Sequence, residues 1–378
     1  MRTLKDIDLR NKRAVLRLDL NVPIQDNKIS DDSRIIASLP TIHRVLKDAK
    51  NLLIISHLGR PEEGVIQKEF SMKPIADYLE RVIDEKITII DCLDSTGLFR
   101  ASKVQILENI RFFKGEKENC EQLGKSLGEL GDVYIFDAFG TAHRKQASTY
   151  SAIKHASQSC AGLLMEKEIT MLSEILNEIN HPFTAIIGGA KISTKINLIS
   201  NLANKASCIV VGGGIANTFL KAAGFEIGES LFEKDFIQVA EKLLETGKIH
   251  LPNQVYVGSH INTDKSIIKD LDELEPTDRI FDLKLNNKII SNLKESKTIL
   301  WNGPLGVFEN KVFEQGTQEL AKIISNSKAF SVAGGGETLA AINKFISKDE
   351  LSYCSSGGGS FLEFMEGKTL PSVEALGG

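Results

Sequence analysis

Short apolar runs rich in β-branched residues alternate along the chain with longer amphipathic stretches. The first half contains RAVLRLDL, NLLIISH, ITIID, VQILEN and DVYIFDA, and the second contains TAIIGG, CIVVGGG, VYVGSH, TILWNG, AFSVAGGG and LSYCSSGGG. Short buried strands that alternate with helices are typical of parallel sheets built from βαβ units. The pattern therefore predicts an α/β protein with two doubly wound parallel sheets of roughly five or six strands each.

A helical pattern lies between the two sets of strands. It runs from about Leu163 to Ile179 and ends before Pro182, which cannot continue a helix. At 378 residues the chain also exceeds the size at which one hydrophobic core usually stops growing. The predicted parts are an N-terminal domain (1–162), an interdomain hinge helix (163–179), a C-terminal domain (180–362) and a C-terminal segment (363–378).

The composition narrows the classes of partner. A formal charge of −4 provides no basic field for nucleic acid or an anionic membrane. The first residues lack an apolar signal core, and no run approaches the roughly 18 apolar residues of a membrane span, so we expect a cytoplasmic protein. Five scattered cysteines suggest neither a disulfide framework nor a zinc site, and we interpret them as small buried hydrophobic residues: Cys92, Cys120, Cys160, Cys208 and Cys354.

Arginine and glycine are distributed unequally between the two halves. Arg144 is followed by a single further arginine, Arg279, whereas the glycine triplets at 212–214, 334–336 and 357–359 all lie in the second half. A guanidinium group can donate two parallel hydrogen bonds to the oxygens of a phosphate or carboxylate, and glycine turns let backbone N–H groups approach phosphates. The first half therefore predicts a site for a small anion, and the second a nucleotide site.

Polar side chains follow most of the predicted strands. In open parallel sheets ligands bind at the carboxyl ends of the strands. In RLDLNVP the alternation of Arg17 with Asp19 and Asn21 predicts that the three side chains share one face and reach the edge together. The first-half candidates are Asp19, Asn21, Arg34, His57, Arg60, Arg111, His143 and Arg144. Turn formation and surface exposure remain alternative explanations for each of them taken alone.

The second half offers candidates of another kind. Lys191 and Lys195 follow a glycine-ended strand and are four residues apart, so we expect them on one face of the next helix. WNGPLGVFE predicts a rigid turn at 302–306, with Glu309 placed to accept hydrogen bonds from ribose hydroxyls. GxxxxGK[ST] and GxGxxG motifs are absent, which argues against P-loop NTPases, dinucleotide-binding dehydrogenases and protein kinases.

Taken together, the motifs resemble those of the phosphoglycerate kinase family. In order they are RLDLNVP, SHLGRP, ENIRF, DAFGTAHR, GGAK, GGGIANTF, WNGPLGVFE, GGGET and SGGGSFLEFMEGKTLP. The resemblance covers essentially the whole chain. It implies two Rossmann-like domains joined by a hinge helix, and transfer of a phosphoryl group from 1,3-bisphosphoglycerate to MgADP, giving 3-phosphoglycerate and ATP.

The resemblance also implies roles for individual residues. Phosphoglycerate binding falls on Asp19, Asn21, Arg34, His57, Arg60, Arg111 and Arg144. Nucleotide binding falls on Lys191, Lys195, Gly212, Gly213, Asn302, Pro304, Glu309, Gly335, Gly336, Glu337 and Thr338. The catalytic set comprises Arg34, Lys191, Lys195, Gly335 and Gly358.

Glu337 is the implied Mg²⁺ ligand, at a position where the family normally has Asp. Its extra methylene moves the carboxylate by about a bond length, which matters because Mg²⁺ tolerates little departure from octahedral geometry. Three milder departures are Thr194, Ser356 and Ser360, which stand where many members have Asp, Thr and Ala.

The implied mechanism needs both domains. Arg34 from one half, with Lys191 and Lys195 from the other, would surround the migrating group, so we expect closure about a hinge at residues 160–180. By resemblance, the C-terminal segment returns to the first domain and the enzyme is a monomer.

Two other functions remain open at this point. A non-catalytic two-domain binder of a phosphorylated metabolite would need the arginine site, but neither the lysines nor the metal-site acid Glu337. Another carboxylate kinase, similar to acetate kinase, would share the reaction type but not these motifs in this order.

Overall fold

The chain divides into two compact units. The computed structural model describes residues 1–93, 98–177 and 179–377. Unit 1 comprises Met1–Thr170 with Thr369–Gly378, and unit 2 comprises Met171–Lys368. The chain therefore passes from one unit to the other twice.

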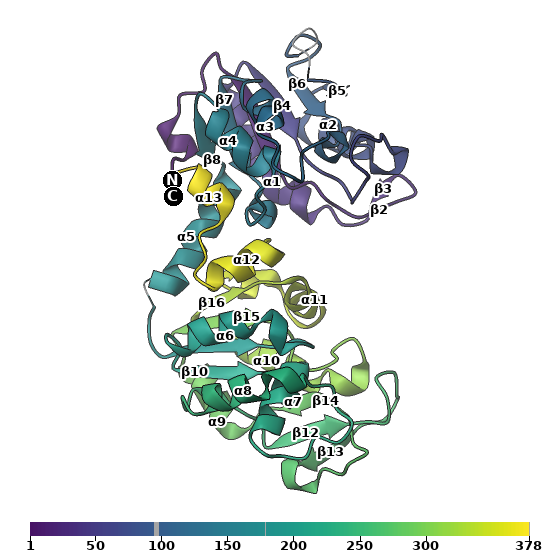
Figure 1. Cartoon of the computed structure of the whole chain (residues 1–378), viewed down its shortest axis with the longest axis vertical. Coiled ribbons are helices and arrows are strands. Elements are labelled where there is room, and N and C mark those ends of the chain that lie inside the picture. The colour runs from purple at the N-terminus through teal and green to yellow at the C-terminus, as the bar shows by residue number, and fades with distance from the viewer. Residues whose placement is uncertain (94–97, 178, 378) are drawn as a thin grey trace. The chain divides into compact units, whose positions relative to one another are not determined.

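Unit 1 is built on a six-stranded sheet in the order β5-β6-β4-β1-β7-β8 (Figure 1). All its pairings are parallel. Its strands are β1 (Arg13–Leu18), β4 (Asn51–Ile55), β5 (Ile87–Ile90), β6 (Val104–Leu107), β7 (Val133–Asp137) and β8 (Ser159–Ala161). A two-stranded hairpin, β2 (Ile24–Gln25) with β3 (Lys28–Ile29), lies apart from this sheet. The central strands are buried over almost their whole length, as the continuous apolar runs predict.

Helices complete unit 1. They are α1 (Ser33–Asp48), α2 (Lys73–Ile83), α3 (Glu121–Gly128), α4 (Ala152–His155), the first part of α5 (Leu163–Asn177) and α13 (Pro371–Ala375). Ile42 of α1 and Leu79 of α2 join Leu16 and Ile54 of the sheet in one hydrophobic core. The C-terminal helix α13, yellow in Figure 1, contacts α4 and is joined to unit 1 by Ser372, whose hydroxyl donates to the carbonyl oxygen of Thr149 over 2.7 Å.

Unit 2 contains a second six-stranded parallel sheet, in the order β11-β10-β9-β15-β16-β17. Its strands are β9 (Phe183–Ile187), β10 (Cys208–Val211), β11 (Ile249–His250), β15 (Thr298–Asn302), β16 (Phe330–Ala333) and β17 (Tyr353–Cys354). Chain order runs outward in both directions from β9 and β15. The crevice between the ends of β9 and β15 is therefore the switch point, where open α/β sheets bind their ligands.

Helices cover both faces of this sheet (Figure 1). They are α6 (Ile196–Ala203), α7 (Gly213–Ala222), α8 (Ile237–Leu244), α9 (Asn287–Glu295), α10 (Gln315–Ser325), α11 (Gly336–Phe345) and α12 (Gly358–Met365). Leu293 of α9, Leu320 of α10 and Ile342 of α11 pack with Trp301 of β15 in the core of one face. The fold class predicted from the pattern, two doubly wound parallel sheets, is confirmed.

One strand was assigned to the wrong sheet. The run VYVGSH was expected in the parallel sheet, but β12 (Gln254–Val257) is the centre of a separate antiparallel sheet with β13 (Ile267–Asp270) and β14 (Ile280–Lys284). Burial alternates along β12, as in a strand with one covered face. A run of three apolar residues is too short to show that alternation.

Two smaller expectations also need correction. Cys160 and Cys208 are buried and Cys354 is half-buried, but Cys92 and Cys120 are exposed. Cys92 follows β5, an edge strand, and Cys120 precedes the first turn of α3, so neither faces a core. Among the described residues, no helix has the length and apolar character needed to span a membrane.

Candidate functional site

In unit 1, the predicted polar residues lie where four neighbouring strands end. Asp19 and Asn21 follow β1, and His57 and Arg60 follow β4. Arg111 lies in the 3-10 helix after β6, Arg144 follows the 3-10 helix after β7, and Arg34 lies in the first turn of α1. Because β6, β4, β1 and β7 are adjacent and parallel, these residues share one edge of the sheet. We call the set of Asp19, Asn21, Arg34, His57, Arg60, Arg111 and Arg144 the arginine site.

Hydrogen bonds connect the loops that carry the arginine site. Arg34 donates from Nη1 to Oδ2 of Asp19 over 2.7 Å. The side-chain oxygen of Asn21 accepts from the N–H of Gly59 over 2.8 Å, and Arg111 donates to the carbonyl oxygen of the same glycine. The loops after β1, β4 and β6 are therefore held together before any ligand binds.

His57 shows that the site is electrostatically unbalanced. The side chain is 3% exposed, and its Nδ1 has no hydrogen-bond partner among the described residues. Burial lowers the pKa of His57 well below its ordinary value, and the charges of nearby arginines, led by Arg17 and Arg111, lower it further. The imidazole is therefore neutral at pH 7.

The arginines also perturb one another. Burial lowers the pKa of Arg111 to about 10, and the neighbouring guanidinium of Arg144 contributes to the decrease. The pKa of Arg144 is lowered by burial and by Arg17, Arg60 and Arg34, whereas Asp19 raises it. Several cations gathered around few acids would be stabilised by an anion between them, which is the behaviour of a binding site.

Arg17 does not reach the edge with Asp19 and Asn21 as expected. It lies inside β1, is 1% exposed, and donates from Nε to the hydroxyl of Ser148 over 3.0 Å. The buried carboxyl of Glu116 accepts from the N–H and the hydroxyl of Ser148, over 2.9 Å and 2.6 Å. The prediction was wrong because it assumed that the alternation of a strand continues to Asn21, whereas β1 ends at Leu18. Arg17 is thus a buried cation behind the site, near Glu116, a buried acid that no sequence motif selected.

In unit 2, glycines allow two loops to interlock at the switch point. A Cβ on Gly188 would lie 1.8 Å from the carbonyl oxygen of Pro304, and one on Gly212 would lie 2.6 Å from Cα of Leu305. Gly213 has a φ of +62°, and a Cβ there would lie 2.6 Å from the carbonyl oxygen of Gly189. Close contact between loops therefore requires these glycines, independently of any ligand.

Gly336 and Gly358 differ from those glycines. A Cβ at either position would meet nothing within 4 Å. Both lie at the first residue of a helix, α11 and α12, where backbone N–H groups are free to bind an anion. Gly335, which precedes α11, has a φ of +101° that favours glycine on conformational grounds.

Lys195 lies beneath the switch point. Its Nζ donates to the carbonyl oxygens of Gly188, over 2.6 Å, and Asn302, over 3.1 Å, and so joins the ends of β9 and β15. Burial lowers its pKa to about 8, and the carboxylate of Glu337 acts in the opposite direction. A lysine with such a pKa is partly deprotonated at mildly alkaline pH, and a nearby phosphate would raise its pKa and restore its full charge.

The two lysines do not share a helical face. Lys191 is exposed, and a 3-10 helix, Ile192–Thr194, separates it from Lys195. The α-helix begins only at Ile196. The prediction was wrong because it extended the helix back to the glycines, whereas the turn after β9 uses a tighter helix first.

Two predicted nucleotide residues support the loops instead of facing a cavity. Thr338 accepts from the N–H of Gly303 over 2.7 Å and donates to the carbonyl oxygen of Gly334 over 2.8 Å. The amide of Asn302 donates to the same carbonyl oxygen over 2.7 Å. Both side chains are buried. They fix the turns after β15 and β16 relative to one another.

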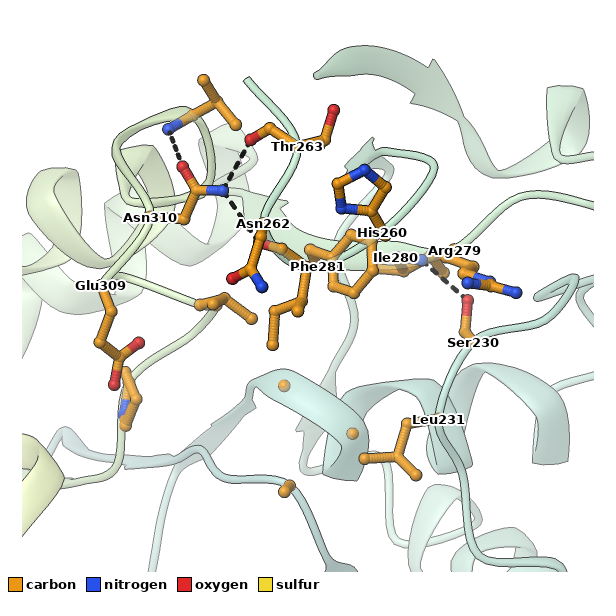
Figure 2. A pocket seen from close by; sticks show the side chains of 18 of the residues that line it. Ser230, Leu231, His260, Asn262, Thr263, Arg279, Ile280, Phe281, Glu309 and Asn310 are labelled. Carbon is orange, nitrogen blue, oxygen red and sulfur yellow. Dashed lines mark hydrogen bonds between the residues drawn. The ribbon is translucent and has the colours of Figure 1, made fainter. Parts of the chain in front are cut away.

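A pocket of about 1280 Å³ opens beside these turns. Among the predicted residues, Gly213, Pro304, Glu309 and Glu337 line it. Other lining residues were not predicted, and Figure 2 shows them across the cavity from Glu309: Ser230, Leu231, His260, Arg279, Ile280 and Phe281. They belong to β14 and to loops around the antiparallel sheet, the part of the chain whose arrangement the sequence pattern did not reveal.

Fold and sites together define a class of protein. An arginine-rich cluster that an anion would stabilise on one α/β unit, and a glycine-lined pocket with a lysine at the switch point of another, are the parts that a nucleotide-dependent phosphotransferase needs.

Comparisons with known proteins identify the family within this class. The profile of the phosphoglycerate kinase family matches residues 4–368. The chain is 46% identical over 377 residues to a phosphoglycerate kinase of Vibrio campbellii, covering 99% of this chain and 97% of the relative. It is 44% identical over 383 residues to that of Francisella philomiragia, with the same coverage of 99% and 97%.

Solved structures agree. Phosphoglycerate kinase from Coxiella burnetii superposes with a TM-score of 0.93 at 42% identity, over 99% of this chain and 98% of the other. The enzyme from Pyrococcus horikoshii gives a TM-score of 0.82 at 32% identity, over 100% and 98%. The chain belongs to the phosphoglycerate kinase family, and it is an enzyme that transfers phosphoryl groups.

Proposed function

We propose that the chain catalyses the reversible transfer of a phosphoryl group from 1,3-bisphosphoglycerate to MgADP. The bond between phosphorus and the acyl oxygen breaks, a bond to the terminal phosphate of ADP forms, and the products are 3-phosphoglycerate and ATP. The observation that carries this proposal is the presence of complementary sites on the two units of a family member. A simple binder of a phosphorylated metabolite would use one of them.

The arginine site would bind the phosphoglycerate. Arg60, Arg111 and Arg144 would supply guanidinium groups for phosphate oxygens, and neutral His57 would offer a ring nitrogen that has no hydrogen-bond partner among the described residues. Asp19 and Asn21 would hydrogen-bond the substrate's polar groups. Excess positive charge and the lowered pKa values of Arg111 and Arg144 support this assignment, because an anion relieves both.

The pocket of unit 2 would bind the nucleotide. Gly212 and Gly213 would lie at the base, Pro304 and Glu309 at the ribose, and Lys191 and Lys195 at the phosphates. The position of Gly213, Pro304 and Glu309 in the lining supports this orientation. Asn302 and Thr338, which are buried, would act through the turns that they hold.

Mg²⁺ would be held by Glu337. The residue is exposed in the first turn of α11 and lines the pocket, and a carboxylate supplies the oxygen ligands that Mg²⁺ prefers. Bound there with the nucleotide, the ion would neutralise charge on the phosphates. Glu337 would thus face a cation, which accounts for a carboxylate beside glycines suited to an anion.

Transfer itself requires positive charge around the migrating group. Arg34 would supply it from unit 1, and Lys191 and Lys195 from unit 2, while N–H groups at Gly335, Gly336 and Gly358 would bind the equatorial oxygens. Lys195 would regain full charge as phosphate approaches, because an anion raises the pKa that burial has lowered.

The proposal further requires the two units to come together, because each contributes one substrate site. Closure would also exclude the water that hydrolyses an acyl phosphate. The chain crosses between the units within α5 and again after Lys368, so these segments are the candidate hinges. Small-angle scattering should show compaction when 3-phosphoglycerate and MgADP are both bound, compared with either alone. Equal radii of gyration would argue against closure.

A coupled assay tests the proposed reaction. Purified protein with 3-phosphoglycerate and MgATP should give 1,3-bisphosphoglycerate, detected through a dehydrogenase that consumes it. Acetate in place of 3-phosphoglycerate serves as the control for a different carboxylate kinase. Binding of 3-phosphoglycerate without turnover would favour the non-catalytic alternative.

A further inference from the structure

A buried carboxyl group lies behind the pocket and has no part in the sites described above. Asp282, in β14, is 1% exposed and follows Phe281, whose ring lines the pocket (Figure 2). Its Oδ2 accepts from the N–H of Gly316 over 2.8 Å. Its Oδ1 is buried and has no hydrogen-bond partner among the described residues. A buried carboxylate with one oxygen unpaired costs more free energy when it is ionised than when it is neutral.

Two glycines make room for this carboxyl group. A Cβ on Gly306 would lie 2.2 Å from Oδ1 of Asp282, and one on Gly316 would lie 2.7 Å from the same oxygen. Gly306 belongs to the loop at residues 303–309, which carries Pro304 and Glu309 and lines the pocket. Gly316 lies in the first turn of α10. Asp282 therefore fills the space between the pocket loop and the helix behind it.

The same helix and strand hold the pocket loop from both sides. The N–H groups of Leu305 and Gly306 donate to the hydroxyl of Thr317 in α10, over 3.1 Å and 3.3 Å. The N–H of Val307 donates to the carbonyl oxygen of Phe281 over 2.8 Å. Any displacement of Asp282 from Gly306 or Gly316 would pull against these bonds and move the wall of the pocket.

The charges around Asp282 favour its neutral form. The pKa of Asp282 is raised to about 8, mainly by burial and to a smaller degree by Glu314, while the N–H groups of Gly316 and Leu283 act in the opposite direction. Tyr256 is its partner across the antiparallel sheet, and Glu314 is paired with Lys344 over 2.6 Å. Among the described residues, therefore, no cationic side chain contacts the carboxyl group of Asp282.

We propose that Asp282 is a positioning residue for the nucleotide: the neutral acid holds the loop at 303–309 against α10, and ionisation releases the loop and weakens nucleoside binding. This inference rests on the proposed function of the pocket, and it adds pH control to that site. Asp282 does not touch the ligand and acts through Gly306 and its neighbours.

Adenosine binding between pH 7 and pH 9 tests the proposal. Adenosine carries no phosphate, so the titration of Lys195 does not enter through a phosphate contact. With a pKa of about 8 the acid is roughly nine-tenths neutral at pH 7 and one-tenth neutral at pH 9, so the apparent Kd should rise by up to about tenfold. Asp282→Asn, which copies the neutral acid, should bind adenosine with the same affinity at both values. The matched control Asp272→Asn, at an exposed acid, should follow the wild type.

Each result decides the question. A rise of about threefold or more in the wild type, absent from Asp282→Asn, supports the role of the neutral acid. A flat wild type, or an equal rise in both proteins, overturns it and leaves the proposed nucleotide site intact. Failure of the wild type to bind adenosine at either pH overturns the site as well. If Asp282→Asn does not fold, ¹³C titration of the wild-type carboxyl groups replaces it: the proposal requires one aspartate that titrates near pH 8 together with the affinity.

Discussion

Three titratable residues of the proposed sites, Lys195, His57 and Arg111, are largely removed from water. Lys195, His57 and Arg111 all have a pKa below the ordinary value of their residue type, and burial is the largest cause in each case. A cation taken out of water without a full counter-charge is destabilised, and an anionic substrate reverses that effect. Single residues can therefore be tested by separating what binds the substrate from what lowers the barrier.

Arg34→Ala should lower kcat far more than it weakens binding of 3-phosphoglycerate. We expect a loss of about a hundredfold or more in kcat, because a preorganised charge matters most where charge develops in the transition state. The dissociation constant of 3-phosphoglycerate should change by about threefold or less, since the other arginines remain. Steady-state kinetics and calorimetry give both values. Equal losses would mark Arg34 as a binding residue alone.

Lys195→Met should stabilise the protein while removing activity. The folded pKa of about 8 lies below the ordinary 10.5, so the unfolded chain binds the proton more tightly. Stability of the wild type therefore rises with pH between about 8 and 10.5, and the whole penalty applies below pH 8. We expect the variant to gain about 1 to 2 kcal/mol at pH 7, with part of the gain offset by two lost hydrogen bonds. Urea unfolding at pH 7 measures the difference, and a less stable variant would contradict this account.

A sequence motif identifies residues near a site, but it does not show whether a side chain contacts the ligand or holds a loop in place. Thr338 and Asn302 belong to a nucleotide motif, yet their side chains are used by the turns at Gly303 and Gly334. That distinction depends on where a hydroxyl or amide points, and motif spacing does not encode it.

At the scale of elements, strand ends were the most predictable feature. Continuous apolar runs gave β1, β4, β6 and β7 and placed the arginine site at their shared edge, because parallel strands end on the same side. β8 and β11, three and two residues long, are too short to produce a periodic signal. The start of α6 was also misplaced, since a 3-10 turn and an α-helical turn look alike in sequence.

The first turn of α11 provides a test at this scale. Glu337→Gln should weaken binding of MgADP by about tenfold while leaving binding of metal-free ADP unchanged or tighter, because the carboxylate would attract the ion and repel the phosphates. Glu337→Asp should shift the apparent Mg²⁺ affinity by about threefold or more, since Mg²⁺ is sensitive to ligand position. Titrations of ADP with and without Mg²⁺ measure these effects. Equal weakening of both forms by Glu337→Gln would remove the metal from the account.

At the scale of the molecule, the candidate sites are divided between the units. The unequal distribution of arginines and glycine triplets predicted this division from the sequence, and the arginine site and the pocket lie in different units. The far wall of the pocket, which includes Phe281 and Arg279, was not predicted. This wall depends on the pairing of β12 with β14, which are far apart in the sequence. The local hydrophobic pattern of a strand does not show which other strand it pairs with.

The most direct test of the central claim is calorimetric titration of 3-phosphoglycerate and of MgADP into two variants, one in each unit. Arg144→Ala should weaken 3-phosphoglycerate binding by about tenfold or more, through loss of a charged hydrogen bond, and leave MgADP binding unchanged. Glu309→Ala should weaken MgADP binding by about fivefold or more and leave 3-phosphoglycerate binding unchanged. If either variant weakens the binding of both ligands to the same degree, the two substrates do not bind to separate units and the account is wrong.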